Sequence, residues 1–235
     1  MLERNQVVEN HFDKVIGEKA RLKHSFDPRS MSLKDRCIMR LLKQNGIEGK
    51  VCLDIGPGTG RWLDFMRQNG AEHLSAVDIS SEVLTRCAEL CDQLQKCDLE
   101  KDSLAQDTDS VDVVIAIEVL EHLQNPSMFL SEIVRVTKPG GIVLMTLPNV
   151  TSFISRIRMM LGMLPVVMVS DPTHVGFYRQ KDLVSLMAPF GLMPEFHATS
   201  FSLNPMKPKS RIRLPSFGKL SNLDDSHVLT MRVPR

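Results

Sequence analysis

The sequence contains very few of the aromatic residues that stack on nucleobases. Its 235 residues include one tryptophan, Trp62, and one tyrosine, Tyr178. Aromatic side chains are the usual platforms for the bases of single-stranded nucleic acid. Lysine and arginine number 29 against 28 aspartate and glutamate residues, so no net field attracts a polyanion. The scarcity of tryptophan and tyrosine and the balance of charge both argue against nucleic acid as a partner.

Long apolar runs are also missing. No stretch approaches the roughly 18 apolar residues that a membrane-spanning helix needs. The first residues, MLERNQVVENHFDK, are charged throughout and lack the apolar centre of a signal peptide. We therefore predict no transmembrane segment and a cytoplasmic location.

Cysteine is present, but not in a metal-binding pattern. The five cysteines are an odd number, and Cys87 and Cys91 are four residues apart on a predicted helix, where they extend its apolar stripe. A zinc site usually has more closely paired cysteines. Buried, reduced thiols are therefore the preferred interpretation. It covers all five residues: Cys37, Cys52, Cys87, Cys91 and Cys97.

What the sequence does have is a regular alternation of apolar runs and amphipathic stripes. The apolar runs cover residues 51–55, 74–77, 111–117 and 142–147. They are typical of strands whose two faces are both covered. Stripes with helical spacing cover residues 7–16, 33–42, 83–94, 126–134 and 183–190. The alternation predicts an α/β fold with a doubly wound, mostly parallel sheet.

Two further extended segments lie near the C-terminus. Residues 193–200 and 227–233 are predicted to pair as an antiparallel hairpin. A proline-rich, basic loop over residues 204–224 is predicted to separate them. Between the strands of the main sheet, the breaker KPGG at 138–141 is predicted to end one helix before the next strand begins.

The most informative stretch is VCLDIGPGTG, residues 51–60, which places three glycines directly behind a predicted strand. A phosphate-binding P-loop would need a Gly-Lys-Ser/Thr ending, which is missing. A dinucleotide fold would need G-x-G-x-x-G, but the spacing here is G-x-G-x-G. Asp54, two residues before the first glycine, is unfavourable beside a pyrophosphate and favourable beside a cation. These features favour S-adenosylmethionine, which carries a sulfonium and an ammonium and no phosphate. A glycine turn without a ligand is the alternative.

Two more carboxylates follow predicted strands. Asp78 ends the second strand about twenty residues beyond the glycines, where a carboxylate can accept both ribose hydroxyls. Asp98 ends the third extended piece and can accept from the adenine amino group. Either acid alone would be interpreted as a solvated turn residue. Three acids at three successive strand ends favour a nucleoside site.

In this order the motifs resemble the class I S-adenosylmethionine-dependent methyltransferases. The resemblance covers roughly residues 47–195 and rests on VCLDIGPGTG, AVDIS, CDLE, VDVVIAIEVLEHL and RVTKPGGIVLMTLPN. It implies the methyltransferase version of the Rossmann-like fold, with seven strands and an antiparallel last strand. It also implies that Gly56 and Gly58 approach the methionine part of the cofactor and that Asp54 contacts its ammonium. Glu118 would lie next to the sulfonium.

At the other end of the cofactor, the resemblance implies that Asp78 holds the ribose. Asp98 and the backbone of Leu99 would hold the adenine. The full implied set of cofactor-binding residues is Asp54, Gly56, Pro57, Gly58, Gly60, Asp78, Ile79, Asp98, Leu99 and Glu118.

The second half of the chain is similar to one subgroup of that family. PNVTSFISRIRMMLG followed by HVGFYRQKDLVSLMAPFGL resembles the subgroup of ubiquinone-type O-methyltransferases and of many enzymes that methylate small molecules or glycans. We therefore predict a single domain over residues 1–235. Its expected parts are a helical cap (1–46), a cofactor-binding core (47–150), an acceptor-site cap (151–178), and a C-terminal helix and hairpin (179–235) with the basic loop 204–224.

Candidate residues for the methyl acceptor come from two segments. EVLEHL supplies Glu118, Glu121 and His122 after the predicted strand 111–117, and SDPTHVGFY supplies His174 and Tyr178. Two carboxylates and two imidazoles suit a divalent metal, Mg²⁺, Mn²⁺ or Zn²⁺, with open positions for a chelating diol or catechol. The pattern resembles the metal site of small-RNA 2′-O-methyltransferases and of some quinone O-methyltransferases.

EVLEHL is equally widespread in methyltransferases that have no metal. His122 or His174 would then be a general base or an acceptor contact, with Tyr178 beside the acceptor, or the histidines would be structural. A helix over residues 151–163 is predicted to cap the acceptor pocket, with a contact helix for a membrane or partner as the alternative. The basic loop could bind an anionic group on the acceptor, or it could simply be solvated.

The sequence thus predicts an S-adenosylmethionine-dependent enzyme that methylates an oxygen of a small acceptor such as a sugar, quinol or secondary metabolite. Three alternatives stay open at this level. They are an N-methyltransferase of a small amine, a non-catalytic module that binds the cofactor or a partner, and a nicotinamide dehydrogenase.

Overall fold

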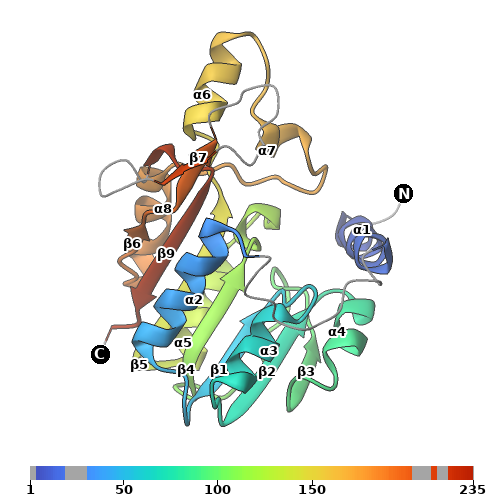
Figure 1. Ribbon diagram of the computed structural model, residues 1–235. Coiled ribbons are helices and arrows are strands. Elements are labelled where there is room, and N and C mark those ends of the chain that lie inside the picture. The colour runs from blue at the N-terminus through green and yellow to red at the C-terminus, as the bar shows by residue number, and fades with distance from the viewer. Residues whose placement is uncertain (1–3, 19–30, 203–212, 216–221, 235) are drawn as a thin grey trace.

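The computed structural model of the chain describes residues 4–18, 31–202, 213–215 and 222–234, and at its centre lies a seven-stranded sheet (Figure 1). The strand order is β3-β2-β1-β4-β5-β9-β6. Only β9 runs antiparallel to its neighbours β5 and β6. The strands are β1 (Val51–Ile55), β2 (His73–Asp78), β3 (Gln93–Lys96), β4 (Val111–Ile117), β5 (Thr137–Pro148), β6 (Glu195–His197) and β9 (Ser226–Arg232). The predicted fold class is confirmed.

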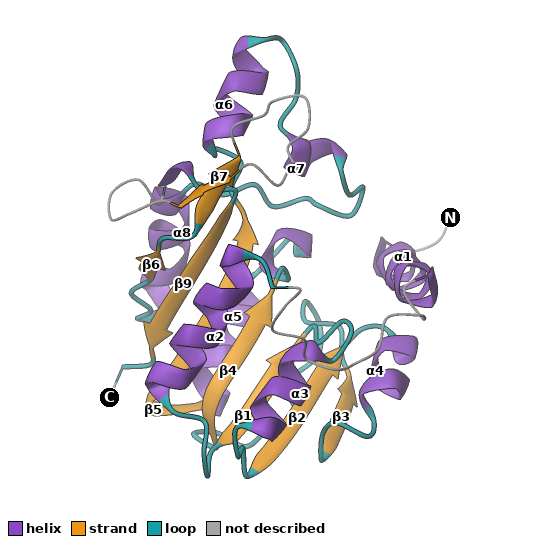
Figure 2. Cartoon of the chain, viewed as in Figure 1, coloured by secondary structure: helices purple, strands orange, loops and turns teal. Residues whose placement is uncertain are grey.

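Helices cover both faces of the sheet (Figure 2). One apolar cluster joins the strands to residues of α2, α3 and α4, and the other joins them to residues of α5 and α8. The helices are α1 (Arg4–Glu18), α2 (Leu33–Asn45), α3 (Arg61–Gln68), α4 (Ser81–Cys87), α5 (Ser127–Val136), α6 (Phe153–Met160), α7 (Val166–Val169) and α8 (Gln180–Met187). Short 3-10 turns are η2 (Leu120–His122) and η3 (Ala188–Phe190). Burial on both faces explains the unbroken apolar runs of the strands.

The sheet has a topological switch point between β1 and β4. From β1 the chain proceeds outward to β2 and β3, and then returns to form β4 and β5 on the other side. Ligands of doubly wound sheets bind at the carboxyl ends of the strands beside such a point. In Figure 1, α1 lies at this end of the sheet, above α4 and beyond the ends of β2 and β3.

The predicted helix over 83–94 is shorter in the structure. α4 ends at Cys87, and residues 93–96 form β3 instead. Asp92 is the reason, because its N–H donates to the Leu74 carbonyl of β2 at 2.7 Å and its carboxylate accepts from the Leu74 N–H at 2.7 Å. The segment is thereby drawn into the sheet. Leu94 consequently lies on an edge strand and is partly exposed.

The KPGG segment is part of β5 rather than a breaker before it. β5 begins at Thr137 and carries a register shift against β4 at this point. The glycines are paired to the C-terminal segment, since Gly140 donates to the Val233 carbonyl and Val233 donates to the Gly141 carbonyl. A β-bulge therefore stands where the sequence predicted a loop.

The C-terminal hairpin is confirmed as the pairing of β6 with β9. A second, two-stranded sheet of β7 (Ser200–Ser202) and β8 (Arg213–Pro215) was not predicted. The basic loop 204–224 lies mostly outside the described residues. The helix predicted over residues 151–163 is shorter, and Met160 at its end and the following Leu161 are 86% and 60% exposed. The helix buries Ile154 and Ser155 instead.

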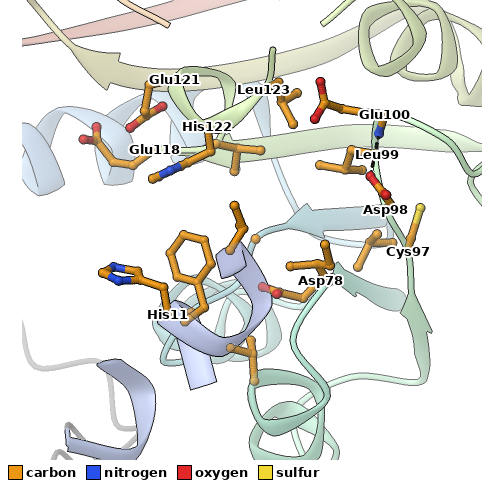
Figure 3. Close-up of a pocket in the computed structure, with 18 of the residues that line it drawn as sticks. His11, Asp78, Cys97, Asp98, Leu99, Glu100, Glu118, Glu121, His122 and Leu123 are labelled. Carbon is orange, nitrogen blue, oxygen red and sulfur yellow. Dashed lines mark hydrogen bonds between the residues drawn. The ribbon is translucent and has the colours of Figure 1, made fainter. Parts of the chain in front are cut away.

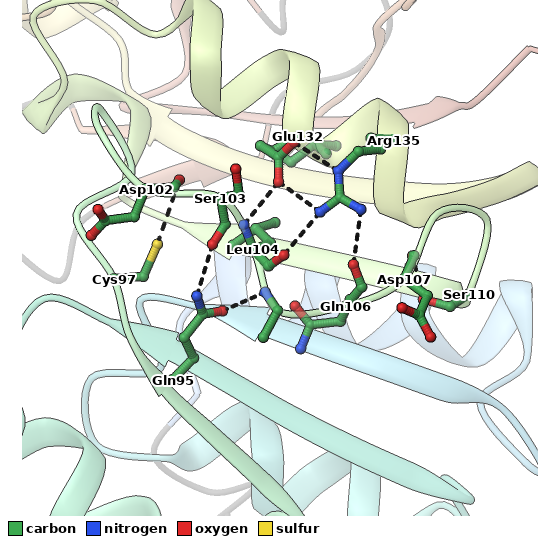
Figure 4. Close-up of polar contacts among 12 residues, drawn as sticks. Gln95, Cys97, Asp102, Ser103, Leu104, Gln106, Asp107, Ser110, Glu132 and Arg135 are labelled. Atoms are coloured by element: carbon green, nitrogen blue, oxygen red, sulfur yellow. Dashed lines mark hydrogen bonds and ion pairs between the residues drawn. The ribbon is translucent and has the colours of Figure 1, made fainter.

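The loop that follows β3 is held by a polar network (Figure 4). Arg135 of α5 donates to the carbonyls of Gln106 and Leu104, each at 2.9 Å, and pairs with Glu132 at 2.7 Å. Glu132 in turn accepts from the Leu104 N–H at 2.8 Å. From the other side, Gln95 donates to the Ser103 carbonyl at 2.8 Å. The network fixes residues 103–106 and with them the loop that begins at Asp98.

The predictions on membrane-spanning helices and on the cysteines can be compared with the described residues. No helix among them is long and apolar enough to cross a membrane. The cysteines are free thiols, and four of them are buried as expected, whereas Cys91 is partly exposed.

Candidate active site

A pocket of about 340 Å³ lies at the carboxyl ends of the strands (Figure 3). Its size is within the range of small-molecule sites. Several elements contribute to its wall. The lining residues are Arg4, Val8, His11, Phe12, Gly56, Gly58, Val77, Asp78, Ile79, Val83, Cys97, Asp98, Leu99, Glu100, Ile117, Glu118, Val119, Glu121, His122, Leu123, Asp171 and His174.

The glycine turn forms one wall at very close range. Gly56 has φ +71°, and a Cβ atom there would lie 2.7 Å from Cγ2 of Val119. Its N–H donates to the Val77 carbonyl at 2.8 Å, which ties the turn to β2. At Gly58 a Cβ atom would meet no heavy atom within 4 Å. The turn is therefore tight on its protein side and open at Gly58, which lines the pocket.

The predicted acids after β2 and β3 both reach the pocket, each together with the residue that follows it, Ile79 and Leu99. Burial raises the pKa of Asp78 to about 6, against the lowering effect of hydrogen bonds from backbone N–H groups. Asp98 accepts from the Glu100 N–H at 3.1 Å and pairs with Lys101 at 3.2 Å. Two carboxylates thus lie along the β1–β3 side of the pocket.

Asp54 is placed differently from this pair. It is buried, and neither carboxylate oxygen has a hydrogen-bond partner among the described residues. Burial, and secondarily the charge of Asp78, raise its pKa to about 8. Asp54, Pro57 and Gly60 do not line the pocket, so their predicted contact with a cofactor stays a prediction. An orphaned buried carboxylate is nevertheless the kind of group that a ligand cation satisfies.

Glu118 lies at the end of β4 in a backbone conformation that is rare for its residue type. Its φ is +58°, and its N–H donates to the Thr146 carbonyl at 2.9 Å. The carboxylate accepts from Lys34 of α2 at 3.0 Å and from the Thr146 hydroxyl at 2.7 Å. Burial alone would raise the pKa of Glu118, but Lys34 and these hydrogen bonds outweigh burial and lower it. Left-handed residues of this kind are concentrated at functional sites.

A cluster of three side chains stands next to Glu118. One potential ligand atom from each of Glu121, His122 and His174 lies within 4.8 Å of the others. Neither carboxylate oxygen of Glu121 has a hydrogen-bond partner among the described residues. Burial and the neighbouring Glu118 raise the pKa of Glu121 well above its usual value. Three of the four predicted metal ligands therefore converge, while the fourth, Glu118, is paired with Lys34.

Both imidazoles of the cluster are held through Nδ1. His174 Nδ1 lies 2.9 Å from the carbonyl of Val167 in α7. Because a carbonyl can only accept, Nδ1 of His174 carries a proton, and in the neutral form of the ring Nε2 has the lone pair. His122 Nδ1 lies 3.0 Å from the Thr173 hydroxyl, and its ring packs edge-on against Phe12 and His174. Burial lowers the pKa of His122 to about 4, so this ring is neutral at physiological pH.

α1 contributes a wall that the sequence did not assign to the site. Arg4, Val8, His11 and Phe12 all line the pocket. Arg4 donates to the His122 carbonyl at 2.7 Å and pairs with Glu100 at 3.3 Å. The four residues follow the i, i+4, i+7, i+8 pattern of one helix face. That face was visible in the sequence, but nothing there indicated what it would cover.

Tyr178, predicted beside the acceptor, does not line the pocket. Its ring is partly buried against the apolar core, and a Cβ atom on Gly176 would lie 2.6 Å from the ring. Its carbonyl accepts from His227 Nε2 at 3.3 Å. The neighbouring segment does reach the pocket through Asp171 and His174. A direct role of Tyr178 in the reaction therefore has no geometric support.

Comparison with known proteins gives a consistent result. A family model described as a methyltransferase domain matches residues 26–195. The chain is 28% identical over 198 residues to the ubiquinone biosynthesis O-methyltransferase of Maricaulis maris, which covers 77% of this chain and 78% of that protein. It is 26% identical over 200 residues to the protein of the same name from Vibrio cholerae, which covers 82% and 78%.

The fold is also found among solved structures. An S-adenosylmethionine-dependent methyltransferase from Thermotoga maritima, described as a possible histamine N-methyltransferase, superimposes with a TM-score of 0.63 over 96% of this chain and 99% of that chain. Its sequence is 16% identical. At that distance the likeness shows the fold alone.

Proposed function

The chain belongs to the methyltransferase-domain family and is an S-adenosylmethionine-dependent methyltransferase, and from this premise we propose that it methylates an oxygen atom of a small acceptor. Sugars, quinols and related hydroxyl-bearing metabolites are the acceptor classes concerned. The observation that carries the proposal is the cluster of Glu121, His122 and His174 at the pocket wall.

The residues at the other end of the pocket fit the cofactor. When bound, S-adenosylmethionine supplies an electrophilic methyl group on a sulfonium. The open Gly58 backbone, the acids Asp78 and Asp98, and the orphaned carboxylate of Asp54 suit a cationic nucleoside without phosphate. We propose that these residues bind the cofactor, with Glu118 near its sulfonium. The protein's main task is then to hold the acceptor in line with the methyl group and to exclude water.

An acceptor hydroxyl must also lose its proton. His174 presents Nε2 with a lone pair, and His122 is a neutral ring at physiological pH. Either imidazole can accept the proton directly as a general base. Glu121 adds a carboxylate without a partner beside them. A hydroxyl acceptor needs such a group, whereas a neutral amine does not, and this is why the cluster favours oxygen over nitrogen.

The same three groups are also a donor set for a divalent metal. Two imidazoles and one carboxylate suit Zn²⁺ or Mn²⁺ better than Mg²⁺, which prefers oxygen ligands. Metal-bound histidines usually donate their second N–H to a carbonyl or a carboxylate, as His174 does to Val167. We propose Glu121, His122 and His174 as the ligands if a metal is used. Glu118 would stay paired with Lys34.

Calorimetry can distinguish a metal site from a histidine that acts as a general base. Mg²⁺, Mn²⁺ and Zn²⁺ are titrated into protein saturated with S-adenosylhomocysteine, beside His174→Ala and the control His73→Ala, a histidine on the far end of β2 that does not line the pocket. Metal binding lost only in His174→Ala would establish a metal site and narrow the acceptor to a chelating diol or catechol. Full enzyme activity without metal binding would leave a histidine base.

Acceptor pairs that differ only in the reacting group test oxygen against nitrogen. We expect transfer to a phenol or sugar hydroxyl and none to the corresponding amine. Transfer to the amine alone, with full activity in His174→Ala, would contradict the proposal and favour an N-methyltransferase of a small amine.

We also propose how the parts of the domain are arranged around the pocket. We propose that residues 1–46 and 151–178 cap a core over residues 47–150, which is supported by the pocket contacts of α1 and of His174. An anionic group on the acceptor and a cytoplasmic location both stay predictions, the first because the basic loop 204–224 lies mostly outside the described residues.

A further inference from the structure

The loop over residues 171–176 is attached to the turn that carries Glu121 and His122. The Glu121 carbonyl accepts from the N–H groups of Val175 at 2.9 Å and Gly176 at 2.8 Å. Within the loop, Asp171 accepts from both the N–H and the hydroxyl of Thr173, at 2.8 Å and 2.5 Å. The loop thus brings a threonine hydroxyl, already bonded to a carboxylate, against the ring of His122.

The hydrogen bonds leave one consistent arrangement of protons. One oxygen of Asp171 accepts from the Thr173 N–H, and the other lies 3.4 Å from Nε2 of His11, so the group is a carboxylate with a nitrogen beside each oxygen. A carboxylate can only accept, and a hydroxyl has a single proton to donate. The Thr173 hydroxyl therefore gives its proton to Asp171 and accepts from His122. The proton of His122 must then be on Nδ1.

We propose that Thr173 and Asp171 are positioning residues, which fix His122 in the Nδ1–H tautomer so that its Nε2 lone pair is available to the pocket. His174 is held in the same tautomer by the Val167 carbonyl. The two rings, supported by different segments, thus present the same atom to the space beside Glu121. This inference rests on the proposed role of the cluster, but the tautomer itself can be measured without any substrate.

The first measurement is long-range ¹H–¹⁵N NMR on the whole protein at a pH where His122 is neutral. His122→Gln identifies the ring by the loss of its signals. We expect the pattern of a protonated Nδ1 and a bare Nε2. The opposite pattern in the unmodified protein would overturn the inference without any variant.

Two substitutions test the direction of the chain of hydrogen bonds. Thr173→Val removes the acceptor and should shift His122 toward the Nε2–H form, while Thr173→Ser should restore the original pattern. Asp171→Ala leaves the hydroxyl in place but frees its proton for Nδ1, so it should also shift the ring toward Nε2–H. An unchanged tautomer in folded Thr173→Val or Asp171→Ala would contradict the inference. Folding is checked by binding of S-adenosylhomocysteine.

Activity gives a second readout. Groups that orient a catalytic or metal-bound histidine typically change activity or metal affinity by about 10–100-fold. We expect a loss of this size in kcat for Thr173→Val, recovery in Thr173→Ser, and little change in affinity for S-adenosylhomocysteine. If the tautomer shifts as expected but kcat does not change, the hydrogen-bond arrangement is correct and the role of His122 in the proposed reaction is wrong.

Discussion

The two ends of the pocket are built in different ways. Toward β1, β2 and β3 the wall consists of a glycine turn and acids that directly follow their strands. Toward β4 it consists of η2 and the much later loop that carries His174, while α1 contacts both ends, since Arg4 donates to the His122 carbonyl and pairs with Glu100. The first end takes its residues from consecutive strand ends, whereas the second assembles segments that are far apart in the chain.

The two ends therefore suit two different tasks: binding a nucleoside, which many proteins of this fold share, and binding a particular acceptor. The carboxyl ends of parallel strands meet at one edge of the sheet, so a nucleoside site can be made from short motifs alone. The proposed acceptor end depends on loops, which differ most among proteins that share a fold. Substitutions at the two ends should therefore separate cofactor binding from turnover.

The largest effect is expected at the glycine turn. Gly56→Ala would place a Cβ atom 2.7 Å from Val119 in a left-handed backbone. We expect about 2–5 kcal/mol of destabilisation and loss of S-adenosylhomocysteine binding in calorimetry. Gly49→Ala is the matched control, since Gly49 has a similar φ of +65° but no atom within 4 Å of the added Cβ. Equal losses of stability in Gly56→Ala and Gly49→Ala would show that backbone strain alone, without the contact with Val119, destabilises the protein.

At the acceptor end, Glu121→Gln should affect turnover rather than cofactor binding. The amide keeps the shape of the side chain but removes its ability to act as a base or an anionic ligand. We expect kcat to fall by about 10²–10³-fold, with affinity for S-adenosylhomocysteine unchanged. Steady-state kinetics and calorimetry on the same preparation measure both quantities. A parallel fall in cofactor affinity would show that the two ends are not separable.

Asp54 should make the stability of the ligand-free protein depend on pH. Its pKa of about 8 in the folded state lies above its ordinary value of 3.8, so the folded protein binds more protons between these values. The free energy of unfolding must then fall as pH rises from about 4 to 8. Asp54→Asn should remove this fall, which amounts to as much as about 5 kcal/mol.

Denaturant unfolding at about pH 5 and pH 8.5 measures that difference. Asp107→Asn, at an exposed carboxylate, is the control. Asp78 contributes in the same direction up to its pKa of about 6. An Asp54→Asn variant with the same pH dependence as the unmodified protein would show that its carboxylate is not buried without a partner.

A smaller effect is expected from the network that holds the loop after Asp98. Arg135→Ala would leave the carbonyls of Leu104 and Gln106 without their donor and separate Glu132 from its partner. We expect a loss of about 1–3 kcal/mol in thermal or denaturant unfolding. Arg179→Ala removes an exposed pair with Asp182 instead and should cost clearly less than Arg135→Ala. Equal costs would mean that the loop does not depend on Arg135.

The smallest effect is expected on α6. Met160 is 86% exposed, so Met160→Gln should change the free energy of unfolding by less than about 0.5 kcal/mol. A destabilisation of more than 1 kcal/mol in denaturant unfolding would show that Met160 is covered in solution.

The sequence predicted the order of strands and helices because fully buried strands and one-sided helices leave clear apolar patterns. It failed where a backbone contact overrode that pattern. Asp92 and Leu74 draw residues 93–96 into the sheet, and the C-terminal segment pairs with Gly140 and Gly141. Such contacts join residues far apart in the chain, which local periodicity does not encode.

Some residues of the candidate site could likewise be predicted from the sequence, and others could not. Asp78 and Asp98 were found because each directly follows a strand of a recognised pattern. Lys34, which pairs with Glu118, and His11, which faces the pocket from α1, gave no such signal. Their place depends on how helices pack across the edge of the sheet. The apolar side of α6 shows another limit of the sequence, since an apolar pattern does not state whether a covering element exists.

The attachment of α1 has a consequence for how the pocket responds to its solvent. The helix reaches its surroundings through ion pairs, with Arg4 on Glu100 and Glu9 on Lys96. Ion pairs near the surface weaken as dissolved salt screens them, whereas burial of apolar strands does not. One wall of the pocket is therefore sensitive to ionic strength, while the sheet behind it is not.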